Sequence, residues 1–500
     1  MKQLKPQDAQ FLYMETENNL SNATMLCIYE QPGNTNFDPV EVISQQLDSQ
    51  LHLSTIFTHH IKQLPGNLDY PYWVIDPYFQ LKNHIFSVTA PSPGDWHSLT
   101  KIYADIHSTA LDLRRPPWEI HVVTGLKDLP DSPGTCFALV IKIHHAAIDG
   151  TAAMRFFQAL HNSSKTVKKA TQNPAEALQY EAPGRRTLLG NAAKNIALSP
   201  VKTLSKLLLQ AKAAAESREA KLSNDKTSKS PVPSTRFNQS VGAQKTFSGV
   251  RFPLADLKSI RGLANGATLN DVILAICSGA LHHYLDKHGE LPNTPLAAWV
   301  PINARSKDAS DIEGNNISAM AIKIASQIND PIERLQKICY ATYDAKSGRS
   351  GRTARIVTDL TQHMPAAGMA VMTRLILGSS MTSKMCNLAI SNVPGPNFPL
   401  FMHGAKCQQQ YGMVPLSDGM GLFIVAMSYD GYMSLSVTST ATILPDIDFF
   451  TECLQQEFDS LLGKIPGTSS KQGAVKKNTP KKPAAKKASA VRAVDSSVKE

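Results

Sequence analysis

Apolar residues form a strand-like run followed by a helix-like run near the end of the first third of the chain. Residues 137–145 read FALVIKIHH, are rich in apolar and β-branched residues, and follow the turn sequence PDSPG. Such a run predicts a β-strand. Residues 150–162, GTAAMRFFQALHN, have the spacing of an amphipathic helix. We therefore expect helices and strands to alternate through residues 1–162.

Composition changes near residues 163 and 245, which divides the chain into two halves. The polar, Pro-containing segment 163–245 is typical of a linker or crossover. Within it, residues 199–222 predict an amphipathic helix that lies on a lipid surface or packs on the protein itself. A second region of helices and strands is expected over residues 246–466. A chain of 500 residues is long enough for two domains of this kind.

The positive charge of the chain is concentrated at its C-terminal end. The formal net charge is +10, but residues 471–500 hold nine Lys or Arg and two Asp or Glu, which leaves about +3 for the rest. A weakly charged body argues against a nucleic-acid-binding core. The low-complexity segment 467–500 is expected to be disordered. It either keeps the protein in solution or attracts anionic membrane lipid.

Cysteine usage and hydropathy indicate a cytoplasmic protein. The seven cysteines are scattered and form no C-x-x-C motif, so we expect neither a disulfide framework nor a zinc site. The N-terminus lacks the apolar run of a signal peptide, and no stretch reaches the ~18 uncharged apolar residues of a membrane span. We expect a soluble or peripheral protein.

The candidate chemistry lies at the end of the predicted strand. Of three His-His pairs, only His144-His145 ends an apolar run and is followed by Asp149-Gly150. Side chains alternate along a strand, so His145 should share a face with Ile143, and His144 with Lys142. An imidazole with a pKa of ~6.5 is suited to act as a general base. Asp149 could orient that imidazole or pair with an arginine elsewhere.

Other catalytic motifs are missing from the sequence. It contains no G-x-S-x-G, H-E-x-x-H, Walker A or G-x-G-x-x-G motif. A histidine base without a protein nucleophile suggests that the substrate supplies the nucleophile. A hydroxyl group attacking an activated acyl group fits this requirement.

These residues resemble a known family. HHAAIDG (144–150) is similar to the HHxxxDG signature of the bacterial wax ester synthase/diacylglycerol acyltransferases, and LDLRRPPWEI (111–120) to their Pro-Leu-Trp block, with Pro117 in place of Leu. ATLNDVILAICSGALHHYL (267–285) resembles the Asn-Asp block, and VPINARS (300–306) and SNVPGP (391–396) fit the C-terminal half. LSNATM (20–25) departs from the family's N-terminal block. The likeness spans about residues 4–460.

The resemblance implies a fold and an activity. The fold is α/β, with two chloramphenicol-acetyltransferase-like α+β sandwich domains and a tunnel between them. The reaction is acyl transfer from acyl-CoA to a long-chain alcohol, giving a wax ester, or to diacylglycerol, giving triacylglycerol in storage lipid synthesis. Acyl-CoA is a substrate, so no cofactor or metal is expected. We also expect the protein to contact an anionic inner membrane or a lipid inclusion peripherally. We expect no nucleic-acid partner.

The resemblance also suggests roles for single residues. His145 is expected to be the general base, and Asn270 an oxyanion donor or, alternatively, the N-cap of the following helix. His144, Asp149, Gly150, Asp271 and Arg305 are interpreted as structural support, with Asp149 pairing with Arg305. Trp118 and Gly395 are candidates for the tunnel wall, although Trp118 could equally belong to the core and Gly395 serve only backbone geometry.

Two further classes of function stay open at this point. One is a condensation-type catalyst that uses another thioester or another acceptor, although the chain shows no carrier domain. The other is a non-catalytic lipid-surface protein that keeps the fold, against which the intact HHxxxDG motif argues. The sequence does not rank an alcohol against diacylglycerol as acceptor.

Overall fold

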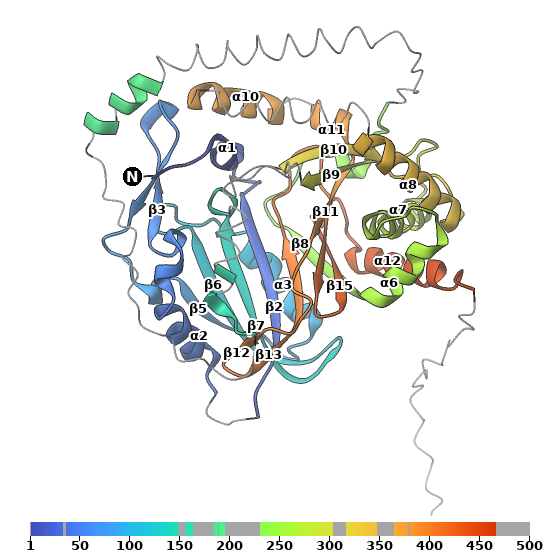
Figure 1. Cartoon of the computed structure of the whole chain (residues 1–500), viewed down its shortest axis with the longest axis horizontal. Coiled ribbons are helices and arrows are strands. Elements are labelled where there is room, and N and C mark those ends of the chain that lie inside the picture. Colours follow the sequence, from blue (N-terminus) through green and yellow to red (C-terminus); the bar gives the residue numbers. More distant parts are fainter. Residues whose placement is uncertain are drawn as a thin grey trace, which may run out of the picture.

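Two six-stranded sheets form the centre of the molecule, with helices packed on their faces (Figure 1). The computed structural model describes residues 2–33, 37–148, 156–157, 159–163, 184, 186–188, 190–195, 231–303, 317–347, 365–378 and 381–466. The expected helix 199–222 and the tail 467–500 lie outside these residues, and the expected helix 150–162 lies largely outside them.

The first sheet has the strand order β12-β13-β2-β7-β6-β5. Its longest strands form the hairpin of β6 (Trp118–Leu129) and β7 (Ser132–His144), joined by a tight turn in which Asp131 has a φ of +55°. The strand predicted over 137–145 is confirmed, but it begins five residues earlier and ends one residue earlier. The remaining strands are β2 (Asn22–Glu30), β5 (Ile85–Thr89), β12 (Phe401–Met402) and β13 (Ala405–Met413).

Side chains of β7 alternate between two cores, as the sequence predicts. Phe137, Leu139, Ile141 and Ile143 face one core, together with α2 (Pro39–Asp48). Ala138 and Val140 face the other, together with α3 (Trp96–His107). A strand buried on both faces has to be nearly all apolar, which explains the continuous run in the sequence.

The second sheet has the strand order β10-β9-β11-β14-β15-β8, and it begins where the second half was expected to begin. Four helices lie beside this sheet on the right in Figure 1. One of them, α7, is largely buried, and the other three pack against it. The strands are β8 (Thr246–Pro253), β9 (Ala297–Asn303), β10 (Ile317–Lys323), β11 (Leu388–Val393), β14 (Phe423–Tyr429) and β15 (Tyr432–Ser439). The helices are α6 (Leu254–Ile260), α7 (Leu269–Lys287), α8 (Pro331–Ser347) and α12 (Ile447–Leu462).

The second half of the chain also contributes to the first sheet. Strand β13 leaves the second half and pairs antiparallel with β2, from Cys407 opposite Tyr29 to Met413 opposite Thr24. The position of a strand in the chain therefore does not decide which sheet it joins, and the domain bounds expected from the sequence stay a prediction. The physical reason is that β7 pairs with only one edge of β2. The backbone groups on the other edge of β2 need partners, and β13 supplies them.

Smaller elements close the end of the molecule at which β7 ends. Helix α1 (Pro6–Met14) packs against α10 (Ala366–Gly378), which is followed by α11 (Met381–Met385), and these helices lie along the top of Figure 1. A three-stranded sheet of β1 (Lys2–Gln3), β4 (Tyr72–Ile75) and β3 (His59–Lys62) lies beside them.

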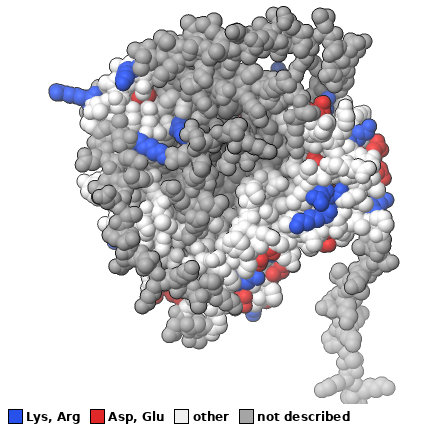
Figure 2. Space-filling view, viewed as in Figure 1, with Lys and Arg blue, Asp and Glu red and all other residues white. Residues whose placement is uncertain are grey.

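Charged residues of both signs are interspersed on the visible face of the second half (Figure 2). Within the described residues, no helix is both long enough and apolar enough to cross a membrane.

Candidate active site

The two adjacent histidines occupy different structural positions. His144 is the last residue of β7, where its backbone N–H donates to the Pro117 carbonyl at 2.9 Å. His145 begins a 3₁₀ turn, His145–Ala147, and its N–H donates to the Ser21 carbonyl at 2.7 Å. The alternation of strand side chains therefore stops before His145, and the expectation that it continues the Ile143 face was wrong. The turn is what directs the imidazole out of the sheet.

The ring of His145 lies against an aromatic ring of α1. The centroids of His145 and Phe11 are 3.8 Å apart and the rings are inclined by only 21°, so they stack. Atom Nδ1 of His145 is buried and has no hydrogen-bond partner among the described residues. The residue also lines the pocket described below.

Burial lowers the pKa of His145 to about 4, although its own carbonyl opposes the shift and neighbouring His144 adds to it. Part of the residue faces the pocket, but protein surrounds the rest of the ring. Desolvation disfavours the charged imidazolium. His145 is therefore a neutral imidazole at pH 7.

His145 lines an apolar pocket of about 410 Å³ between the two halves of the chain. The first half supplies residues from α1 and the segment after it, and the second half supplies residues from β9, α11, β11, β14 and the segment before β14. Apolar side chains dominate: Phe11, Met14, Trp299, Pro301, Met385, Val414, Pro415, Leu416, Met420 and Phe423. Such a lining suits a hydrocarbon chain. A tunnel through the molecule stays a prediction.

His144 is buried and contacts groups on both of its ring nitrogens. Nδ1 accepts the Ala146 N–H at 3.1 Å, which caps the 3₁₀ turn, and Nε2 lies 3.1 Å from Oε1 of Glu15. Glu15 and Phe11 were not predicted from the sequence as site residues. Neither belongs to a motif that neighbours the histidines in the chain, so only the folded structure brings them together.

Asn270 and Asp271 lie in the first turn of α7. Thr268 is the N-cap of this helix: its hydroxyl accepts the Asp271 N–H at 3.3 Å, and Asp271 accepts the Thr268 N–H at 2.7 Å. The alternative that Asn270 caps the helix was therefore wrong. A Thr three residues before an acidic residue was the signal for this capping box. Asn270 is not among the residues that line the His145 pocket.

Trp118 and Gly395 are both placed by contacts away from this pocket. Trp118 has no exposed surface, donates from Nε1 to the Phe57 carbonyl at 3.2 Å, and packs on His84 with a centroid distance of 4.6 Å. A Cβ at Gly395 would collide with the Ser428 carbonyl of β14. Trp118 is therefore a core residue, and Gly395 is glycine because the backbone of β14 leaves no room for a side chain.

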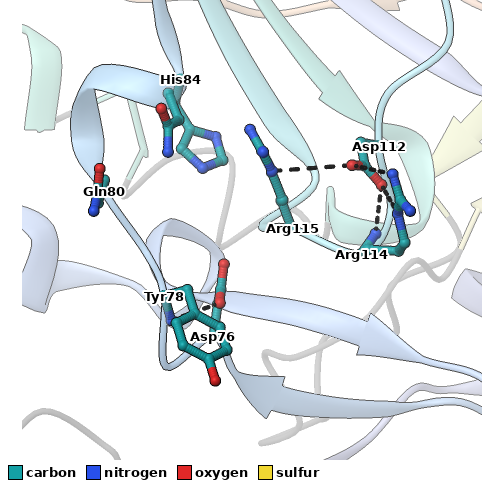
Figure 3. Close-up of a pocket in the computed structure, with 8 residues that line it drawn as sticks. Asp76, Tyr78, Gln80, His84, Asp112, Arg114 and Arg115 are labelled. Carbon is teal, nitrogen blue, oxygen red and sulfur yellow. Dashed lines mark hydrogen bonds and ion pairs between the residues drawn. The ribbon is translucent and has the colours of Figure 1, made fainter.

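A second, polar hollow of about 450 Å³ lies near Trp118 (Figure 3). Arg114 and Arg115 lie 2.9 and 3.9 Å from the carboxylate of Asp112, and Asp76 also lines the hollow. Two arginines and two aspartates cancel in charge, so the hollow is not a strong anion site. The Arg-Arg pair of the LRRPPW block thus serves a local turn before β6.

Asp149, Gly150 and Arg305 lie outside the described residues, so the expected pairing of Asp149 with Arg305 stays a prediction. Within the described part, no group of three or more His, Cys, Asp or Glu side chains could hold a metal ion.

The fold matches that of acyl-transferring and condensing enzymes. A solved wax ester synthase/diacylglycerol acyltransferase from Marinobacter aquaeolei VT8 superposes with a TM-score of 0.65, is 24% identical, and is covered over 98% of its length and 92% of this chain. The TRI3 trichothecene 15-O-acetyltransferase from Fusarium sporotrichioides has a TM-score of 0.58 at 9% identity, covering 92% of this chain and 94% of that one. The chain therefore shares its two-domain fold with these acyltransferases.

Sequence comparison identifies the family. Residues 4–273 match the wax ester synthase/diacylglycerol acyltransferase catalytic domain, and residues 313–462 match the WS/DGAT C-terminal domain. The chain belongs to this family of acyltransferases. The O-acyltransferase WSD of Acinetobacter baylyi (strain ATCC 33305 / BD413 / ADP1) is 27% identical, covering 93% of this chain and 98% of that one. MT1809 of Mycobacterium tuberculosis (strain CDC 1551 / Oshkosh), named provisionally as a diacylglycerol O-acyltransferase, is 30% identical, covering 91% and 90%.

Proposed function

We propose that this acyltransferase transfers a fatty acyl group from acyl-CoA to the hydroxyl of a long-chain alcohol or of diacylglycerol, with His145 as general base. The observation that carries the proposal is the placement of a neutral imidazole in the wall of an apolar pocket between the two halves. The family supports acyl transfer, and the lining supports a substrate with long hydrocarbon chains.

The proposed reaction needs one proton to move twice. Nε2 of His145 removes the proton of the acceptor hydroxyl, whose oxygen attacks the thioester carbonyl and forms a tetrahedral intermediate. The carbon–sulfur bond then breaks, and the imidazolium gives the proton to the departing thiolate. The products are an ester and free CoA. General base catalysis of this kind contributes ~10²–10⁴ in rate, and holding the two substrates together contributes through orientation.

The oxyanion of the intermediate needs a hydrogen-bond donor. Asn270 was the candidate from sequence, but other residues with donor side chains line the pocket, among them Ser391 and Ser417. The Ser21 hydroxyl already donates to the Phe11 carbonyl at 2.6 Å. Ser391 and Ser417 are therefore better supported than Asn270.

We also propose that the enzyme meets its lipid acceptor at the surface of the inner membrane or of a lipid inclusion. Helix α10 buries Ala366, Met369 and Ala370 against α1, yet Val371 and Leu375 on its outer face are 58% and 68% exposed. Met385 of α11 is exposed as well and lines the pocket. An apolar surface that continues into the pocket would let a lipid enter without crossing water.

The test is the release of free CoA thiol by the purified full-length protein. Palmitoyl-CoA would be supplied with hexadecanol in one reaction and with dioleoylglycerol in another, and the ester product identified by chromatography. We expect CoA release with at least one acceptor, and a loss of ~10²-fold or more in His145→Ala.

Other outcomes separate the remaining hypotheses. No CoA release above background with either acceptor contradicts the proposal and favours a condensation-type catalyst with another thioester or acceptor, or a non-catalytic lipid-surface protein. Near-normal turnover by a folded His145→Ala variant contradicts the assignment of the base. The proposed contact of α10 with a lipid surface is tested by binding to lipid vesicles. Equal binding by the wild-type chain and by a Val371→Ser/Leu375→Ser variant contradicts this contact.

A further inference from the structure

We infer that Glu15 is a positioning residue of this active site, which holds His144 in a single tautomer and thereby fixes the turn that carries His145. The inference rests on the proposed role of His145 as base. It concerns a carboxylate at the C-terminal end of α1, far from the HHxxxDG motif in sequence.

The contact of Nδ1 determines where the proton of His144 lies. Nδ1 accepts the N–H of Ala146 at 3.1 Å, so Nδ1 carries no proton in this arrangement. A neutral imidazole must then carry its proton on Nε2. The opposite tautomer would set an Nδ1–H against the N–H of Ala146, and the cap of the turn would be lost.

Glu15 is the acceptor for the Nε2–H of His144. Oε1 of Glu15 lies 3.1 Å from Nε2, which is buried and has no other partner among the described residues. This contact does not meet the usual geometric limits of a hydrogen bond. The attraction between a carboxylate and an N–H dipole depends less on angle than a hydrogen bond between neutral groups does, so the distance decides the partner.

The same oxygen of Glu15 also anchors the segment that follows α1. Oε1 accepts the backbone N–H of Ser21 at 2.9 Å. Burial raises the pKa of Glu15, but the contacts with His144 and Ser21 outweigh it and bring the pKa below its ordinary value. Glu15 is therefore a carboxylate at neutral pH.

Ser21 connects this carboxylate to the catalytic ring. The Ser21 carbonyl accepts the N–H of His145 at 2.7 Å, and the Ser21 hydroxyl donates to the carbonyl of Phe11, whose ring stacks on His145. Glu15 thus acts on His145 along two routes: through the His144 cap and through Ser21. Neither route places Glu15 in contact with the substrate, since Glu15 does not line the pocket.

The first test compares two substitutions of Glu15 in full-length enzyme assayed for CoA release. Glu15→Ala removes the acceptor, and we expect kcat to fall ~10- to 100-fold, the effect of a small misplacement of a catalytic group, while KM changes little. Glu15→Gln keeps a carbonyl oxygen that can accept the Nε2–H of His144 and the backbone N–H of Ser21. We therefore expect this variant to retain most of the activity. Glu17→Ala, an exposed acid in the same segment, is the matched control and should leave kcat unchanged.

The second test is a double-mutant cycle with His144→Asn. The side-chain oxygen of an Asn at position 144 can accept the N–H of Ala146, as Nδ1 of His144 does. Asn has no ring N–H, so it does not need Glu15 as an acceptor. We therefore expect Glu15→Ala to lower kcat much less in the His144→Asn background than in the wild type. A contribution of Glu15 to overall stability alone would lower kcat equally in both backgrounds.

The outcomes separate this inference from the proposed function. Wild-type kcat in a folded Glu15→Ala variant overturns the inference and leaves His145 as base, as does an equal loss in both backgrounds or a Gln variant as impaired as the Ala variant. If Glu15→Ala does not fold, Glu15→Gln still decides, because a strongly reduced kcat in this folded variant overturns the inference. Failure of the wild type to release CoA contradicts the proposed function instead.

Discussion

His145 combines a stacked ring with a pKa far below the ordinary value for histidine. Phe11 covers one face of the imidazole, and the Nδ1 atom of His145 is buried. An imidazole with such a low pKa is fully deprotonated at neutral pH, and in the proposed role it is a weaker base than an exposed histidine. Burial thus sets both the protonation state and the orientation of the group.

The pH dependence of kcat/KM should follow from this pKa. Because the pKa of His145 is about 4, the ring loses its proton well below pH 6. We expect kcat/KM with palmitoyl-CoA to stay level from pH 8 down to about pH 5 and to fall by tenfold per pH unit below about pH 4. The measurement is initial CoA release across this range, with the fold checked at each pH by circular dichroism. A decline centred near pH 6.5 would show that burial does not shift the base.

At the scale of single elements, α7 shows how a polar first turn supports a buried helix. Asp271 is only 2% exposed, yet it accepts from Thr268 and from the Thr342 hydroxyl, at 2.6 Å, so its oxygens are satisfied. The rest of α7 is mostly apolar and fills the core beside the second sheet. Its N-terminus is therefore fixed by capping and its remaining length by burial.

Substitution at Thr268 should weaken the second half without affecting the chemistry. Thr268→Val removes the hydroxyl that accepts the Asp271 N–H, and we expect a loss of ~1 kcal/mol in the free energy of unfolding. Thr268→Ser should restore most of it, and Asn270→Ala should change it by less than ~0.5 kcal/mol, since Asn270 is not the cap. Urea unfolding followed by fluorescence measures these differences. A larger loss in Asn270→Ala than in Thr268→Val would contradict the assignment of the cap.

At the scale of the whole molecule, the crossing of β13 into the first sheet ties the two halves together. Tyr411 of β13 packs in the core that contains α3, and its ring lies edge-on to that of Phe247 of β8 at a centroid distance of 5.9 Å, so both sheets contribute to one contact region. The pocket lies between the same halves. Any movement of one half relative to the other would therefore change the pocket around His145.

Acid should destabilise the folded molecule strongly between pH 6.5 and pH 4. Burial lowers the pKa of His107 to about 3 and those of His145 and His161 to about 4. The unfolded chain, with histidine pKa values near ~6.5, binds up to three more protons than the native state in this window. The free energy of unfolding therefore rises with pH there, by up to ~4 kcal/mol per pH unit from these three groups.

Urea denaturation at pH 4.5, 5.5, 6.5 and 7.5 measures this dependence. His161→Phe removes one of the three buried histidines. In the folded variant we expect the slope of the free energy of unfolding against pH to fall by ~1.4 kcal/mol per pH unit, the contribution of one proton. Stability that is unchanged from pH 7.5 to pH 4.5 would contradict the neutral burial of these histidines.

Local patterns in the sequence determined the elements and singled out the histidine that we propose as the base. The run at 137–145 predicted β7 because alternation of side chains is a property of neighbouring residues. The composition change near residue 245 located the start of the second sheet. His145 could be singled out because its motif is contiguous in the chain.

Only the tertiary structure decided what surrounds His145. Glu15 and Phe11 reach the histidines because α1 packs across the end of β7, a contact between segments far apart in sequence. The entry of β13 into the first sheet was equally hidden, since a strand's own sequence does not specify which free edge its backbone will join. Neighbouring residues encode the elements and the chemistry they carry, whereas the environment that tunes this chemistry arises from packing between distant segments.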